Sequence, residues 1–335
     1  MKRFLAFILI VFSIFLITGC GKVDKNSIIK KMNNDINKIK GYQVEAELEL
    51  ISGDDSYKYD VIVSYKKKDN YRVALMNKNN NHEQIILKNK SGVYILTPDL
   101  NKSFKFQSNW PYNNSQGYMM HSVIKDLKND PKVKMKKTKD GYVFTSKVNY
   151  KNNANLTHQN VVVDKDLNIK SVTVLDDDEN AQMKIKYKSI DKNAKFKDNY
   201  FVLEENMKMS SDKNEDDEEE SASLNEAVYP MYLPEGTYLD KEKVVDLDGG
   251  ARVILTFSGE KPFMLIEETA YREDEFEIVP TSGDIEMDTL GVAIVDDTSV
   301  NWVNDDIEYY LVSSNLSKTE LLQVARSISS MPISK

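Results

Sequence analysis

The sequence contains few of the residues that most often build catalytic and metal centres. Among its 335 residues there are one cysteine and three histidines. A single cysteine cannot form a disulfide within the chain, and His82, His121 and His158 are too widely spaced to match a zinc motif. No glycine-rich phosphate loop and no G-x-S-x-G motif occurs. We therefore expect a protein that is not an enzyme and that uses neither a metal nor a cofactor.

The N-terminus has the pattern of a secretory signal peptide. Two basic residues precede an apolar run over residues 4–17, which is too short to span a bilayer comfortably. The next residues, Ile17-Thr18-Gly19-Cys20, resemble the lipobox of bacterial lipoproteins. That resemblance implies that residues 1–19 are removed, that Cys20 receives a diacylglyceryl group and that residues 20–25 form a lipidated tether. The alternative is a transmembrane anchor with an incidental cysteine.

An acidic run near the middle of the chain indicates a boundary between two domains. Residues 210–223, SSDKNEDDEEESAS, contain no large apolar side chain and cannot bury enough surface to offset the entropy of ordering. We interpret residues 207–225 as a solvated acidic linker, with an acidic calcium-binding tract as the alternative. The exported chain is longer than one core usually organises. We therefore expect one domain over residues 26–206 and a smaller one over residues 226–335.

Charge divides the chain into a basic and an acidic half. Residues 21–206 contain 33 lysines and arginines against 24 acidic residues, whereas residues 207–335 contain 10 against 29. A basic half attached to a membrane can lie against anionic headgroups, or the two halves can attract each other. Scattered, solvated lysines are the simplest alternative. An exported lipoprotein rarely meets nucleic acid, so we expect no such partner.

Alternating apolar residues predict a sheet in the first domain. Residues 43–51, 57–65 and 71–75 place apolar and polar side chains in turn, which is the period of a half-buried strand. Further strand patterns continue to residues 196–203, and helices are expected at the start of the domain and over residues 116–129. Long sheets of this kind curve and leave a concave face that helices can cover. The expected fold class is α+β, with a large curved antiparallel sheet (an incomplete barrel), covering helices and a smaller α+β C-terminal domain.

The same alternation selects the side chains of the concave face. We expect an apolar cavity lined by some of the residues that point to one side of the first strands, namely Val44, Ala46, Leu48, Tyr59, Val61, Val63, Tyr71 and Val73. A filled core is the alternative, because a lined cavity and a packed core require the same alternation.

Three segments of the first domain resemble the LolA-type lipoprotein-carrier family. They are SGVYILTPDLNKSFKFQ at residues 91–107, the helix containing MMHSVIKDL, and residues 161–206, with Asn193 between the last two expected strands and Phe201 after it. The resemblance extends over about residues 24–206. It implies an incomplete β-barrel that is closed by helices and whose apolar cavity can hold an acyl chain.

A lipid anchor distinguishes this chain from the soluble shuttles of that family, because an anchored protein cannot travel between two membranes. The whole arrangement is similar to the YdcC-type sporulation lipoproteins of endospore-forming bacteria. The first domain is also similar to the GerS-type germination lipoproteins, which act as partners of a peptidoglycan amidase. These resemblances imply a role in sporulation or germination on the outer face of the cell membrane.

The second domain ends in a well-marked helix. Ser317 and Glu320 have the spacing of a capping box, and Leu316 and Leu321 that of a hydrophobic staple. Short apolar segments before this helix have strand patterns. Residues 226–331 resemble a small extracytoplasmic α+β domain of unassigned function.

Two functions follow from these patterns. In the first, the protein is an envelope scaffold or regulator that binds another envelope protein, such as a peptidoglycan hydrolase. In the second, the concave face binds an acyl chain or a lipoprotein moiety. We favour the first, because an anchor at Cys20 removes the mobility that a carrier needs.

Overall fold

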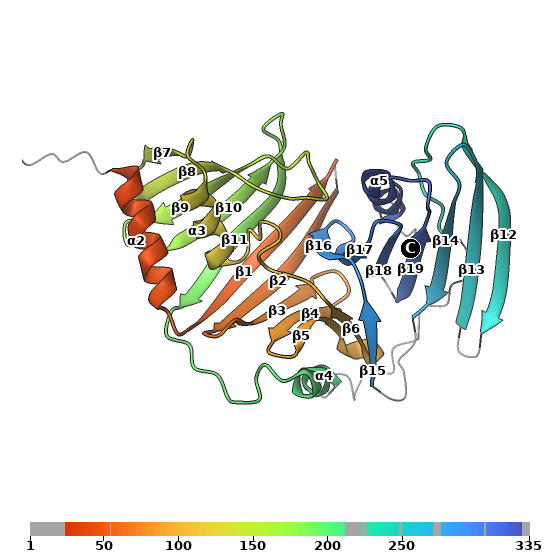
Figure 1. The fold of residues 1–335 in the computed structure, drawn as a ribbon, viewed down its shortest axis with the longest axis horizontal. Coiled ribbons are helices and arrows are strands. Elements are labelled where there is room, and N and C mark those ends of the chain that lie inside the picture. The colour runs from red at the N-terminus through yellow and green to blue at the C-terminus, as the bar shows by residue number, and fades with distance from the viewer. Residues whose placement is uncertain are drawn as a thin grey trace, which may run out of the picture.

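Two β-sheets and a few helices make up the described part of the protein (Figure 1). The computed structural model describes residues 24–53, 55–211, 224, 227–247, 250–270, 276–304 and 306–329. The expected signal peptide, Cys20 and most of the expected linker lie outside these residues. The predicted α+β class is confirmed, with a large antiparallel sheet in the first part of the chain and a smaller sheet with a terminal helix in the second.

The larger sheet, here called sheet A, holds twelve strands. Two antiparallel meanders meet where β1 pairs with β11. The strands of sheet A, in spatial order from one edge to the other, are β15 (Glu277–Thr281), β6 (Lys102–Phe106), β5 (Gly92–Thr97), β4 (Glu83–Asn89), β3 (Asn70–Asn77), β2 (Asp55–Lys66), β1 (Gly41–Ser52), β11 (Ala181–Asp191), β10 (Ile169–Leu175), β9 (His158–Asp164), β8 (Gly141–Lys147) and β7 (Lys134–Lys137).

The strand β15 is an unexpected member of sheet A. It comes from the C-terminal part of the chain, yet it pairs with β6 in parallel, with Val279 opposite Phe104. Every other strand of this sheet comes from residues before 192. The two parts of the protein therefore share a sheet, which the sequence patterns did not indicate.

Helices α2 (Lys25–Lys38) and α3 (Met120–Asn129) lie together at one end of the concave face of sheet A (Figure 1). Asp24 caps α2, because its carboxylate accepts a hydrogen bond from the backbone N–H of Ser27 at 3.0 Å. Ile28, Met32 and Ile36 recur at helical spacing and are buried in the core under the helix. The helix is thus held by an apolar stripe that faces the sheet.

Helix α4 (Leu203–Ser211) packs on the opposite face of sheet A. The apolar cluster beneath it consists of Ala74, Ile85, Leu87, Tyr94, Leu96, Phe201, Leu203 and Met207. The side chain of Arg72 donates from Nε to Oδ1 of the fully buried Asn206 at 2.6 Å. Asn206 in turn donates to the carbonyl oxygens of Tyr200 and Val202 at 3.0 and 2.8 Å. This network fixes the helix to the sheet.

The strand expected over residues 196–203 is wrong. This segment is a loop with turns that leads into α4. Phe196, Tyr200 and Phe201 contact one another with ring centroids 4.8 to 5.2 Å apart, and they pack against the outer face of sheet A instead of extending it. Helix α4 also continues across residue 206, so the beginning of the expected linker at residues 207–211 is helical. The domain limits themselves stay a prediction.

The smaller sheet, here called sheet B, holds seven strands and is covered on one face by α5 (Lys318–Ser329). The predicted capping box of α5 is confirmed: the N–H of Ser317 donates to Glu320 Oε2 at 2.9 Å, and the N–H of Glu320 donates to Ser317 Oγ at 3.3 Å. The strands of sheet B, in spatial order, are β12 (Thr237–Leu247), β13 (Gly250–Gly259), β14 (Phe263–Thr269), β19 (Ile307–Val312), β18 (Ser299–Asn304), β17 (Gly291–Val295) and β16 (Asp284–Asp288).

Candidate functional site

The residues expected to line a cavity lie together on one face of β1, β2 and β3. The register of the three strands places these side chains next to one another: Val44 lies opposite Val63, and Val63 lies opposite Val73. All are buried, with exposed fractions of 6% or less for Val44, Ala46, Leu48, Tyr59, Val61, Val63, Tyr71 and Val73. They belong to one continuous apolar cluster that also includes side chains of α2 and α3.

The other end of this concave face is occupied by the hairpin of β16 and β17, which extends from sheet B (Figure 1). In the hairpin, Ile285 pairs with Ile294 and Met287 pairs with Val292. All four side chains are buried in the same cluster as the concave-face residues. The C-terminal part of the chain therefore supplies a piece of the core of sheet A.

Polar side chains fasten the hairpin at its rim. The loop between β6 and α3 supplies two of them: Asn113 donates to Asp284 Oδ1 at 3.0 Å, and Asn114 donates to Glu286 Oε1 at 2.8 Å. Asn152 donates to the same oxygen of Glu286 at 2.6 Å. The Glu286 side chain is nearly inaccessible to water, so these amides replace the solvation that its carboxylate loses.

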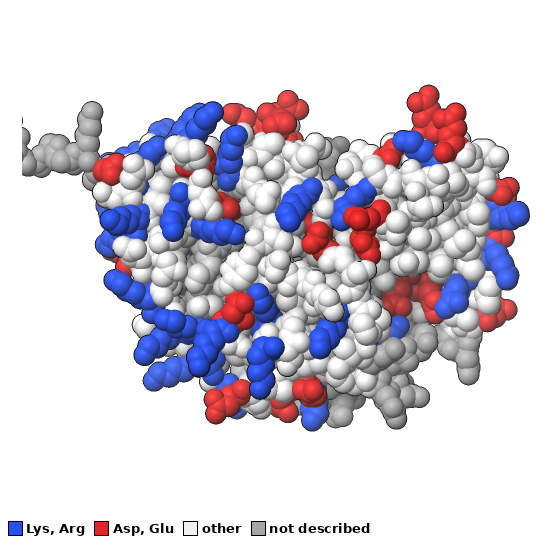
Figure 2. All heavy atoms as spheres, in the orientation of Figure 1, with Lys and Arg blue, Asp and Glu red and all other residues white. Residues whose placement is uncertain are grey.

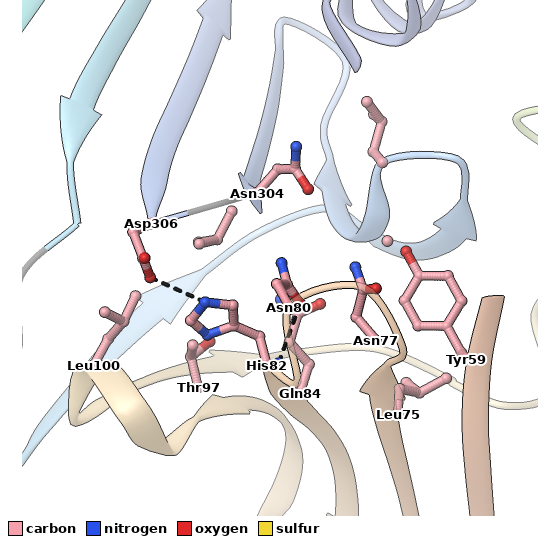
Figure 3. Close-up of a pocket in the computed structure, with 13 residues that line it drawn as sticks. Tyr59, Leu75, Asn77, Asn80, His82, Gln84, Thr97, Leu100, Asn304 and Asp306 are labelled. Carbon is pink, nitrogen blue, oxygen red and sulfur yellow. Dashed lines mark hydrogen bonds and ion pairs between the residues drawn. The ribbon is translucent and has the colours of Figure 1, made fainter. Parts of the chain in front are cut away.

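A second seam joins the two parts around His82 (Figure 3). The Nε2 atom of His82 lies 3.1 Å from Asp306 Oδ1, and its Nδ1 atom lies 3.5 Å from Asp99 Oδ2. The hydrogen bonds to Asp306 and Asp99 raise the pKa of His82 from 6.5 to about 10, so the ring is charged at neutral pH. Lys102 and Glu308 form a further ion pair at 3.0 Å across the same seam.

Three small cavities open along the line where the hairpin meets sheet A, and the smallest, of about 10 Å³, lies between Tyr118, Met183 and Ile285. Another, of about 40 Å³, lies beside His82 and Asp306, and Tyr59 and Gly291 contribute to its wall (Figure 3). The third, of about 220 Å³, lies between Leu50, Met183 and Met287 and has Arg326 of α5 among its lining residues. Of the eight expected cavity residues, only Tyr59 lines any of these spaces. In this conformation the rest of the concave face is packed.

His121 lies in an aromatic cluster on the concave face. His121 stacks with Tyr42, at 5.5 Å between ring centroids, and packs beside Tyr65 and Tyr71. Burial lowers the pKa of His121 to about 4, so the ring is neutral at pH 7. In the part of the chain that the structure describes, no three His, Cys, Asp or Glu side chains gather as a metal site. No described helix is both long enough and apolar enough to cross a membrane.

The sequence did not indicate the hairpin contact or the His82 seam. Residues 284–288 alternate for only five positions, and His82 and Asp306 both occupy polar turns that look like ordinary surface loops. The pairing of such distant segments leaves no periodic signal. The expected lipidation site, Cys20, lies outside the described residues.

Together, a large open antiparallel sheet, covering helices and a second sheet that contributes to its core define a two-part α+β protein. A family described as "Sporulation protein YdcC-like" matches residues 1–201. The chain is 32% identical over 333 residues to the sporulation protein YdcC of Bacillus subtilis, covering 98% of this chain and 97% of that protein. The chain belongs to the YdcC-like family, which confirms the predicted resemblance.

Solved structures give more distant similarities. The complex of the CwlD amidase and the GerS lipoprotein from Clostridioides difficile matches at 20% identity over 54% of this chain and 100% of that chain, with a TM-score of 0.23. A LolA superfamily protein from Nitrosomonas europaea matches at 12% identity over 55% of this chain and 99% of that chain, with a TM-score of 0.31. The fold described above rests on the strand pairings of this chain itself.

Proposed function

We propose that this protein is a non-enzymatic lipoprotein of the cell envelope that serves sporulation or germination by binding another envelope protein. The observation that carries this proposal is the seating of Ile285, Met287, Val292 and Ile294 in the concave face of sheet A. A face that the chain fills with its own hairpin is not available to an acyl chain without a rearrangement. Membership of the YdcC-like family supports the sporulation role.

The anchor completes this proposal. A diacylglyceryl group on Cys20 would hold the protein on the outer face of the cell membrane of an endospore-forming bacterium. The partner, such as a peptidoglycan hydrolase, would then be recruited to that membrane. The protein would act as its scaffold or regulator and would contribute no catalytic group of its own.

An exposed apolar surface favours a protein partner. Of the eleven large hydrophobic side chains that are exposed among the described residues, seven lie between residues 229 and 244. Met231, Tyr238 and Val244 are the most exposed of these, at 69%, 59% and 57%. They lie on β12, one of the two edge strands of sheet B, and on the segment that leads into it. Tyr238 pairs with Ser258 and Val244 with the buried Val253, so these two side chains point to opposite faces of β12, and we take the free edge of sheet B as the candidate interface.

Co-precipitation from membranes of sporulating cells tests the proposal. We expect the wild-type protein to bring down the same envelope protein in repeated experiments, and the double variant Met231→Glu/Tyr238→Glu to lose most of it. Val202→Glu is the matched control, because Val202 is also exposed, at 38%, but lies immediately before α4. If the wild type and the double variant recover the same proteins in equal amounts, this surface does not bind the partner. If the wild type recovers none reproducibly, the scaffold function is wrong.

The second candidate function is binding of an acyl chain or a lipoprotein moiety on the concave face. Its support is the uniformly apolar cluster around Val61 and Val63, together with the polar fastening of the hairpin that could release it. In this version, Val61→Glu and Val63→Glu abolish ligand uptake while the folded protein persists. Equal lipid content in the wild type and both variants would rule it out.

A further inference from the structure

Exposed lysines gather at the end of the molecule where α2 and β7 lie (Figures 1 and 2). Residues 24–40 and 128–140 contain eleven lysines and four aspartates, and no arginine or glutamate. Lys25 is partly buried. The ten exposed lysines, here called the lysine end, are Lys30, Lys31, Lys38, Lys40, Lys128, Lys132, Lys134, Lys136, Lys137 and Lys139.

Packing brings these two segments together. Helix α2 lies against α3, and Lys25 Nζ at the start of α2 donates to the carbonyl oxygen of Val133 at 2.5 Å, just before β7. Because β7 is the last strand of sheet A, its lysines stand at a free edge. Lysines on an edge strand also discourage pairing with other sheets. That role does not account for the lysines of α2, which lie on the solvent side of a helix.

The lysine end is not neutralised within the protein. None of its ten lysines is in an ion pair with another described residue, whereas Lys78, Lys88 and Lys102 elsewhere on sheet A each are. Of the four aspartates in these segments, Asp35 and Asp140 are exposed among the ten lysines, whereas Asp130 accepts hydrogen bonds from the backbone N–H groups of Lys132 and Lys147. Asp24 is committed to the cap of α2. A concentrated positive field therefore remains for an external anion.

The short distance between the lysine end and Cys20 indicates which anion it meets, namely the headgroups of the membrane. Helix α2 begins five residues after Cys20, a distance of at most about 18 Å for an extended chain. A lipid at Cys20 would bring the lysine end to the surface of the bilayer. The acidic part of the chain, with the exposed strand β12, lies at the other end of the long axis (Figure 1).

We propose that the lysine end binds the headgroups of anionic phospholipids, and so orients the protein with sheet B pointing away from the membrane. The interaction is electrostatic and needs no lipid on Cys20. Each lysine that reaches an anionic surface strengthens binding by a factor of about five, and salt weakens the attraction over a Debye length of about 8 Å at physiological ionic strength. The proposal goes beyond the scaffold function and does not depend on the partner.

Vesicle co-sedimentation of the chain from residue 21 onward tests the proposal, because this chain keeps every described residue and has no anchor. We expect binding to vesicles of phosphatidylglycerol and phosphatidylcholine in equal parts, loss of binding in 0.5 M salt, and none to phosphatidylcholine alone. The variant Lys30→Glu/Lys31→Glu and the variant Lys136→Glu/Lys137→Glu should each bind at least ten-fold more weakly.

The matched control is Lys241→Glu/Lys243→Glu, which makes the same charge change with exposed lysines on β12, at the far end of the molecule. It should bind as the wild type does. An equal loss in this control would mean that net charge alone governs binding and would overturn the proposal. The proposal would also be overturned if the wild type bound inorganic polyphosphate as strongly as it binds the anionic vesicles. Circular dichroism confirms that each variant is folded.

Discussion

The imidazole of His82, just before β4 in sheet A, lies 3.1 Å from the carboxylate of Asp306, in the turn between β18 and β19 of sheet B. Asp99, which follows β5, approaches the other ring nitrogen at 3.5 Å. A charged histidine between two carboxylates thus connects the two parts of the protein. Four apolar side chains of the β16–β17 hairpin make the larger contact between the same two parts.

The His82 seam should make stability fall at alkaline pH. The pKa of His82 is raised from 6.5 to about 10 in the folded protein, chiefly by the hydrogen bonds to Asp306 and Asp99. The folded state therefore holds this proton more tightly than the unfolded state does. The stabilisation is complete below about pH 6.5 and is lost as the pH rises towards 10. We expect the Tm of the wild type to fall over this range and that of His82→Gln to fall less.

Thermal unfolding followed by circular dichroism between pH 6 and pH 10 measures this difference. Asp306→Asn is the matched variant. It removes one of the two carboxylates that stabilise the charged His82 ring, so its Tm should depend on pH less steeply than that of the wild type. Parallel Tm curves for the wild type and His82→Gln would show that the ion pairs do not stabilise the seam.

The buried His121 should make the stability of the protein fall at acid pH. Burial lowers the pKa of its ring to about 4, and its Nδ1 lies 3.3 Å from the hydroxyl of Tyr42. The unfolded chain binds a proton near pH 6.5, before the folded chain does, so stability is lost as the pH falls from 6.5 to 4. The variant His121→Gln should lose less stability over this range. Urea unfolding at pH 4.5 and pH 7.5 measures the change, and an equal loss in both proteins would contradict it.

The buried link between α4 and sheet A should be costly to break. Asn206→Ala leaves the Nε–H of Arg72 without its acceptor in a buried position, and we expect a loss of about 2 to 3 kcal/mol in the free energy of unfolding. The control is Asn199→Ala, which removes an exposed hydrogen bond to Glu205 and should cost less than about 0.5 kcal/mol. Equal losses in the two variants would mean that the buried pair has no special role.

The capping box of α5 should contribute measurably to sheet B. Ser317→Ala removes the acceptor for the N–H of Glu320, and we expect a loss of about 1 kcal/mol. Ser314→Ala is a suitable control because Ser314 is exposed and lies before the helix begins. Chemical denaturation of both variants provides the comparison, and a loss no larger in Ser317→Ala than in Ser314→Ala would refute the prediction.

The sequence predicted those features of the fold that depend on local periodicity, such as the buried face of a strand and the start of a helix. Alternation along β1 located Val44, Ala46 and Leu48 on one buried face, and the spacing of Ser317 and Glu320 located the start of α5. Residues 196–203 were misassigned because an aromatic cluster can pack against a sheet from outside as well as extend it. The hairpin contact was missed because Ile285 and Ile294 also satisfy the pattern of an ordinary strand pair. What a strand packs against is decided by the tertiary fold.

Native mass spectrometry of the chain from residue 21 onward, expressed in bacteria and purified without detergent, tests most directly whether the chain's own hairpin fills the concave face. The account predicts a protein with no bound lipid, because Ile285, Met287, Val292 and Ile294 occupy the space that an acyl chain would need. A stoichiometric lipid released on denaturation would contradict it and would make the protein a lipid-binding module.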